Sequence, residues 1–129
     1  MRLLALDYGV VRTGVAVSDE TGTLASPLTV VARAGSDAGL DEIERLVSDH
    51  GVARVVVGLP VSLDGREHGQ AREVRSFVAR LAARLDVPVV LYDERFTTTI
   101  ARRRGGAGAL DARAAAALLE DYLGATQPT

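Results

Sequence analysis

The stretch that decides the fold reads ALDYGVVRTGVAVSD and covers residues 5–19. It belongs to two runs rich in apolar and β-branched residues, 2–7 and 12–18, which the short segment YGVV separates. Such a pattern is typical of a β-hairpin, with Gly9 free to adopt a turn conformation. The first run ends on the carboxylate of Asp7. The second carries Gly14, which we expect where the return strand passes close to a neighbour.

The rest of the chain alternates strand and helix patterns. Runs of apolar residues predict further strands at 27–33, after the turn DETGT, and at 53–60 and 87–94; the last two are expected to be buried, with 53–60 covered on both faces. Helical spacing of apolar residues predicts helices at 37–50, which Gly51 follows as a stop, and at 70–85 and 110–123, and a further helix is expected to begin near residue 95. This order predicts an α/β domain with a mixed five-stranded sheet, in which three antiparallel strands precede two parallel ones and helices cover both faces.

Length and composition narrow the class of protein. The chain has 129 residues, which suits one domain; we expect it to span 1–124, with a flexible tail at 125–129. No cysteine is present, so disulfides and thiolate metal sites are excluded. The start lacks the pattern of a secretory signal and no apolar run reaches about 18 residues, so we expect a cytoplasmic protein without a membrane partner.

Charge is unevenly distributed along the chain. Residues 66–104 hold 9 Arg against 5 acidic residues, whereas residues 1–65 hold 5 Arg against 9 acidic residues. A basic middle between acidic flanks is consistent with binding of a polyanion, but also with an ordinary solvated helix face. All 15 basic residues are Arg, which suits phosphate contacts and is equally explained by a GC-rich genome.

Carboxylates stand where two predicted strands end. Asp7 closes the first strand, and Asp93 and Glu94 close the last one. Ligands of open α/β sheets gather at the carboxyl ends of strands, and acids placed there together repel unless a cation neutralises them. Oxygen ligands favour Mg²⁺ or Mn²⁺ over zinc. Asp111, before the last helix, is a third candidate ligand; taken singly, Asp111 also suits a helix cap and Asp7 a turn.

Four segments then identify a resemblance. ALDYGVVRTGVAVSD, VVVGLPVSLDG, LYDERFTT and LDARAAAALLEDYL, in this order, resemble the motifs of the YqgF/RuvX family of ribonuclease H-like nucleases. The resemblance implies a ribonuclease H-like fold and maturation of the 5′ end of pre-16S rRNA. The alternative is cleavage of Holliday junctions, as by RuvC-type resolvases. Those enzymes place an acid where this chain has Gly58-Leu59-Pro60, which puts strict resolvase activity in doubt.

The resemblance also implies a two-metal phosphodiesterase site. Its acidic positions fall on Asp7, Glu94 and Asp111, and we expect Asp7 to bridge two Mg²⁺ or Mn²⁺ ions. Gly9 would leave room for the scissile phosphate. Further contacts to nucleic acid are expected from Arg12, Arg95, Thr97, Thr98, Arg102, Arg103 and Arg104. His68 is a candidate for proton transfer, although a loop histidine is commonly only solvated.

Two other functions remain open from the sequence. D-x-G-x-x-x-x-G, at residues 7–14, is similar to the phosphate-binding hairpin of actin-like ATPases, but those proteins close two such domains around ATP. A non-catalytic RNA-binding module would not require clustered acids. The expected partners are a structured RNA precursor or branched DNA, and ribosomal precursor particles. The sequence allows a monomer or a homodimer.

Overall fold

The computed structural model describes residues 1–59, 69–93 and 109–126. The elements in these ranges are, in chain order, β1 (Arg2–Asp7), β2 (Arg12–Ser18), β3 (Ala25–Ala32), α1 (Asp37–Asp49), β4 (Val52–Leu59), α2 (Gly69–Ala82), β5 (Val89–Asp93) and α4 (Ala109–Thr126). The helix predicted to begin near residue 95 lies outside the described residues.

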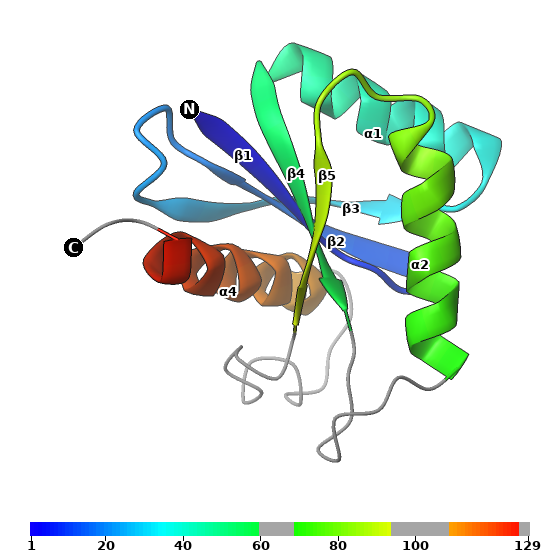
Figure 1. The fold of residues 1–129 in the computed structure, drawn as a ribbon. Coiled ribbons are helices and arrows are strands. Elements are labelled where there is room, and N and C mark those ends of the chain that lie inside the picture. Colours follow the sequence, from blue (N-terminus) through cyan, green and yellow to red (C-terminus); the bar gives the residue numbers. More distant parts are fainter. Residues whose placement is uncertain (60–68, 94–108, 127–129) are drawn as a thin grey trace.

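The five strands form one mixed sheet in the order β3-β2-β1-β4-β5. The hairpin of β1 and β2 and the pairing of β2 with β3 are antiparallel, whereas β1, β4 and β5 run parallel. The predicted fold class is therefore confirmed. Because β1, β4 and β5 run in the same direction, their carboxyl ends meet at one end of the sheet (Figure 1).

Helices cover both faces of this sheet (Figure 1). On one face, Leu4 and Leu6 of β1 pack in the core under α1 and α2, together with Phe77 of α2. On the other face, Leu3 and Ala5 pack against α4. This alternation follows from the two-residue period of a strand, and it decides on which side each side chain of the strand end lies.

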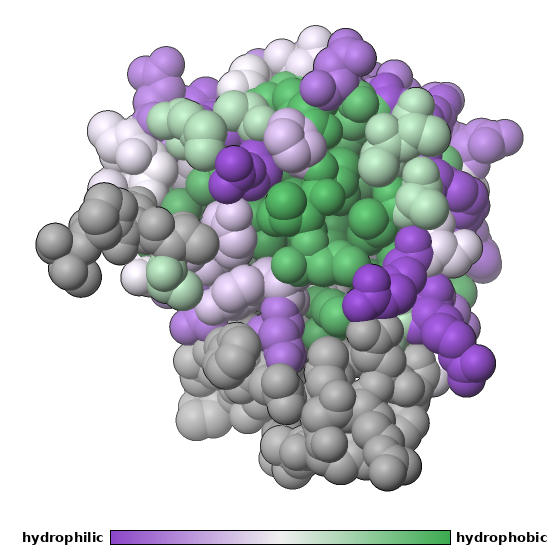
Figure 2. Space-filling view, viewed as in Figure 1, coloured by the Kyte–Doolittle hydropathy of each residue, from purple (hydrophilic) through white to green (hydrophobic). Residues whose placement is uncertain are grey.

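The two parallel strands beside β1 differ in burial. Val55, Val56 and Val57 of β4 are fully buried, which confirms a central strand covered on both faces. The prediction of a buried strand is wrong for β5, whose residues are only half-buried; among the described residues β5 is the last strand of the sheet, with β4 beside it on one side only. Apolar side chains gather around this strand, between α2 and α4 (Figure 2).

The helix boundaries follow from local chemistry. Ser36 caps α1 because its hydroxyl accepts a hydrogen bond from the Gly39 N–H at 3.1 Å. Gly51, with φ +60°, follows the helix as the predicted stop. α4 continues to Thr126, so two residues of the predicted tail are helical. None of the helices in the described ranges is long and apolar enough to cross a membrane.

Candidate functional site

Asp7 is the last residue of β1 and is half-buried at the carboxyl end of the parallel strands. Counting back by the period of two places it on the same face as Leu3 and Ala5, which pack against α4. The carboxylate therefore points to the side of the sheet that α4 covers. This is the position that the sequence predicts for a ligand at a strand end.

Glycines flank Asp7 on both neighbouring strands. Gly14 of β2 is its direct partner in the antiparallel register. On the other side, Leu6 pairs with Val57, so the register continued by one residue brings Gly58 beside Asp7. Neither neighbour projects a side chain over the α4 face at this row. Asp7 therefore has backbone without a side chain beside it on both neighbouring strands, and the close approach predicted at Gly14 stays a prediction.

The turn after Asp7 requires glycine for a reason internal to the hairpin. A Cβ on Gly9 would lie 2.3 Å from the carbonyl oxygen of Arg12, closer than any real contact. The Thr13 hydroxyl closes the same turn: it donates to the Gly9 carbonyl at 3.2 Å and accepts from the Gly9 N–H at 3.3 Å. The hairpin needs Gly9 for its own closure, and the clearance of a phosphate there stays a prediction.

Tyr8, the residue after Asp7, anchors the hairpin on the opposite face. Its ring stacks on Phe77 of α2 with centroids 4.5 Å apart. Phe77 is fully buried, so this stack ties the end of β1 to the main core. Asp7 is therefore positioned by a rigid strand, and not by a free loop.

Asp93 and Asp7 lie on opposite faces of the sheet. Asp93 pairs with Leu59, whose side chain is in the core under α1 and α2. Paired residues of neighbouring strands share a face. The side chain of Asp93 therefore lies on the α2 side, whereas Asp7 lies on the α4 side. The sequence left Asp93 and Glu94 as alternative ligands. Because Asp93 lies on the face away from Asp7, it is the less suitable of the two to share a metal ion with Asp7.

Tyr92, which the sequence analysis did not single out, lies on the Asp7 face of β5. Its hydroxyl donates to Asp121 of α4 at 3.2 Å, and its ring meets Tyr122 edge to face at 5.4 Å. Burial and the neighbouring Asp121 carboxylate raise the pKa of Tyr92. Arg54 of β4 donates to the Tyr122 hydroxyl at 3.0 Å. These contacts fix α4 against β4 and β5.

The remaining predicted residues are placed only in part. Arg12 begins β2 and is exposed. Asp111 belongs to the first turn of α4, but its side chain is outside the description. The other predicted site residues lie outside the described ranges: Glu94, Arg95, Thr97, Thr98, Arg102, Arg103, Arg104 and His68. Among the residues that the structure describes, no three His, Asp or Glu side chains are grouped to hold a metal ion.

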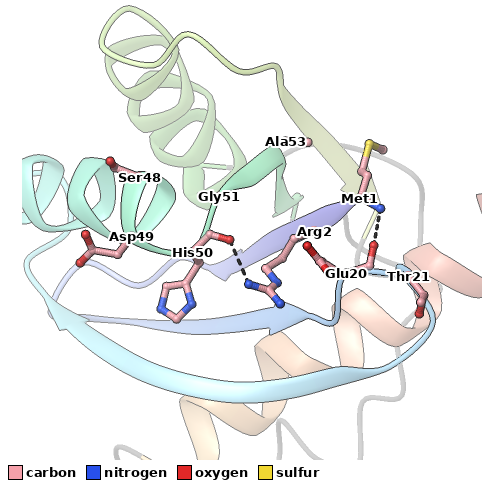
Figure 3. A pocket seen from close by; sticks show the side chains of 9 residues that line it. All are labelled: Met1, Arg2, Glu20, Thr21, Ser48, Asp49, His50, Gly51 and Ala53. Atoms are coloured by element: carbon pink, nitrogen blue, oxygen red, sulfur yellow. Dashed lines mark hydrogen bonds between the residues drawn. The ribbon is translucent and has the colours of Figure 1, made fainter.

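A separate cavity of about 750 Å³ lies at the other end of the sheet. Its lining residues are Met1, Arg2, Glu20, Thr21, Ser48, Asp49, His50, Gly51 and Ala53 (Figure 3). Arg2 donates to the His50 carbonyl at 3.2 Å, and the amino terminus donates to the Glu20 carbonyl. Arg2 and Asp7 are the two ends of β1, about 17 Å apart at the rise of a strand. The cavity is thus distinct from the Asp7 site.

Comparison with solved structures defines the class of fold. Thermus thermophilus RuvC superposes with a TM-score of 0.61 over 97% of this chain and 95% of that chain, at 16% identity. The structure of the same enzyme in complex with a Holliday junction substrate superposes with a TM-score of 0.60 over 97% of this chain and 94% of that chain, at 18% identity. The fold is therefore the ribonuclease H-like fold of RuvC.

Sequence comparison defines the family. The RuvX family, described as Holliday junction resolvase, matches residues 1–125. A protein of Anaeromyxobacter dehalogenans (strain 2CP-C) named "Putative pre-16S rRNA nuclease" is 42% identical over 99% of this chain and 100% of its own length. A protein of the same name from Chloroflexus aggregans is 41% identical over 95% of this chain and 93% of its own length. The chain belongs to the RuvX family of nucleases, which confirms the resemblance seen in its motifs.

Proposed function

We propose that this chain is a metal-dependent nuclease that hydrolyses phosphodiester bonds of structured nucleic acid, and that it processes the 5′ end of pre-16S rRNA in the cytoplasm. The family and the names of relatives about 40% identical over nearly the whole chain support a nuclease that acts in rRNA processing. Ribosomal precursor particles are then the partner in which the substrate is presented.

A single observation carries the proposal: Asp7 ends β1 with a bare glycine on each side. The carboxylate has Gly14 and Gly58 as neighbours in the sheet, on the face that α4 covers. A catalytic carboxylate needs such room, because a metal ion and the phosphate it binds must both reach the oxygen atoms. An acid that only closed a turn would not need this space.

The donor set fits Mg²⁺ or Mn²⁺. Asp7 supplies hard carboxylate oxygens, and the sequence contains no cysteine. Asp111 belongs to the helix that covers the Asp7 face, and the parity of β5 favours Glu94 over Asp93 as the third ligand. When bound, a pair of such ions would activate a water molecule and neutralise charge on the phosphate and the leaving oxygen.

The chain's own residues would bind and orient the substrate around these ligands. Arg12, exposed at the start of β2, would contact a backbone phosphate from the hairpin. Contacts from the segment after β5 would come from Arg95, Thr97, Thr98 and the arginines 102–104. Because most of these contacts are charge-assisted, affinity should fall steeply as salt rises.

Four-way DNA junctions are the second candidate substrate. The family description and the RuvC complex with a Holliday junction favour it. Symmetric cleavage of a junction needs two active sites, so this activity would require a homodimer, whereas trimming of an RNA end could be done by a monomer. The oligomeric state in solution therefore helps to separate the two substrates.

The test is Asp7→Asn, assayed on a structured pre-16S rRNA fragment and on a four-way DNA junction with Mg²⁺ or Mn²⁺. We expect a loss of about 1,000-fold in the cleavage rate, since the effect of a catalytic metal is several kcal/mol. Asp93→Asn is the matched control, because this acid ends a neighbouring strand on the other face; it should cut within about twofold of wild type. A wild-type rate in Asp7→Asn would refute the metal site. A wild type that binds both substrates and cuts neither would support a binding module.

A further inference from the structure

The tip of the β1–β2 hairpin exposes two adjacent apolar residues beside Asp7. Val10 is 58% and Val11 57% exposed. The other large apolar residues exposed in the described ranges, Met1 and Leu24, lie at the far end of the sheet. Two neighbouring valines in water at the tip of a turn are unfavourable unless something covers them in the functional state.

This tip is held in one conformation. The Thr13 hydroxyl bonds both backbone groups of Gly9, as described above. From the turn that follows β3, the Arg33 N–H donates to the Val11 carbonyl at 2.9 Å. The backbone of Arg33 has a φ of +45° there, a left-handed conformation that is energetically unfavourable for residues other than glycine. The exposed valines are therefore presented by a braced turn, which reduces the entropy lost when they bind.

Positive charge lies next to the valines at the same end of the hairpin. Arg12 follows Val11 directly and pairs with Ala32, the neighbour of Arg33, in the antiparallel register. Both arginines are exposed. Apolar residues next to two exposed arginines match the chemistry of a nucleic-acid strand, in which phosphates alternate with sugars and bases.

We propose that the hairpin tip, defined as Val10, Val11, Arg12 and Arg33, is a substrate-binding surface that positions the nucleic acid over Asp7. The valines pack against a sugar or base edge, and the arginines bind phosphates on either side. Val10 follows Asp7 by three residue steps, a span of at most about 10 Å, or about three nucleotide steps of 3.4 Å. The proposal rests on the proposed function, because it assigns this surface to the substrate of the same site.

The test measures binding in an Asp7→Asn background, in which cleavage is removed, to a pre-16S rRNA fragment and to a four-way DNA junction. The double variant Val10→Ser, Val11→Ser should raise Kd about tenfold on the physiological substrate, without changing the slope of log Kd against log salt. Arg33→Gln should lower that slope by about one. Leu24→Ser is the matched control, an exposed apolar residue on the other turn of β2, and should bind as the parent does.

Several outcomes would overturn the proposal. Binding of the double valine variant within twofold of the parent on both substrates would remove the valines from the interface. A dimer that becomes a monomer in the double variant would assign the tip to self-association instead. If the protein with Asp7 intact binds these substrates but never cuts them, only the nuclease proposal fails. The proposal for the hairpin tip is then decided by the Kd values of the variants. If it binds neither substrate, both proposals fail.

Discussion

β2 is entered and left through two turns at opposite ends of the sheet, and the two are stabilised differently. The turn after β2 holds itself together with polar side chains: the Asp19 carboxylate accepts from the N–H groups of Thr23 at 2.9 Å and Leu24 at 3.1 Å. The turn before β2 depends on Thr13 and on Arg33 from the turn after β3, and it leaves Val10 and Val11 exposed to water.

The difference indicates which turn is only a connection. The Asp19 turn satisfies most of its polar groups with its own side chains, and the amino terminus adds one hydrogen bond to the Glu20 carbonyl. The hairpin beside Asp7 uses a buried hydroxyl and a left-handed arginine to hold a sequence that is poor in turn-forming side chains. Strain and exposed apolar surface of this kind are common near functional sites.

The largest contrast should come from the two glycines. In Gly9→Ala the new Cβ would collide with the Arg12 carbonyl, so the backbone must shift; we expect a loss of about 3 kcal/mol in the free energy of unfolding. In Gly22→Ala, the φ of +72° is unfavourable and the new Cβ would lie 3.2 Å from the Met1 carbonyl oxygen, a milder contact than the one at Gly9; a loss of about 1 kcal/mol is expected. Urea unfolding measures both. Equal losses would mean that the hairpin relaxes easily.

The next contrast concerns hydroxyl groups. Thr13→Val keeps the shape of a fully buried side chain but removes both hydrogen bonds to Gly9, and should cost about 1.5 kcal/mol. Thr21→Val removes an exposed hydroxyl that donates to Asp19 at 2.7 Å, and should cost less than about 0.5 kcal/mol. The pair can be compared by thermal and urea unfolding. A larger loss of stability in Thr21→Val than in Thr13→Val would mean that the Asp19 turn, and not the hairpin beside Asp7, depends more on its hydroxyl group.

Acid should weaken the Asp19 turn. Hydrogen bonds from the Thr21 hydroxyl, and then from the N–H groups of Thr23 and Leu24, hold the pKa of Asp19 well below its usual value. A depressed folded pKa means that the carboxylate stabilises the fold fully above its unfolded pKa of about 4, and that this stabilisation is lost as the pH falls from there toward the folded pKa. In Asp19→Asn this part of the acid sensitivity should disappear, and cleavage at pH 7 should be unchanged. Parallel urea titrations at pH 7 and pH 3 test it; an equally acid-sensitive variant would contradict it.

The smallest expected effect is a gain. Arg33→Gly relieves the left-handed backbone at φ +45°, and should raise the free energy of unfolding by about 0.5 kcal/mol. Arg33→Ala keeps the strain and should leave stability nearly unchanged. Both variants should lower the salt slope of nucleic-acid binding, if Arg33 contacts phosphate. If Arg33→Gly gains stability and nucleic-acid binding is unchanged, the left-handed backbone of Arg33 has no role in binding the substrate.

Much of this architecture could be predicted from the sequence because its signals are local. The YGVV and DETGT segments indicated turns on both sides of β2, and the helical spacing of 37–50 indicated α1 with Gly51 as its stop. Four motifs in the right order, of which the one containing Asp7 is the first, were specific enough to indicate the family. For Gly9 the sequence suggested clearance for a phosphate and missed the steric reason within the turn, the close Arg12 carbonyl. Contacts between backbone atoms of a turn cannot be inferred from the residue types alone.

The sequence by itself determined that Asp7 ends a strand and that acids follow another strand, since strand ends are marked by local composition. Only the tertiary structure decided which acids share a face. β5 is apolar on both sides, so its sequence has no alternation from which the face of Asp93 could be read. Its pairing with Leu59 sets that face, and the register of β1 with β4 brings Gly58 beside Asp7. Register is set by pairing between segments about fifty residues apart, and a site built across several strands therefore depends on the whole sheet.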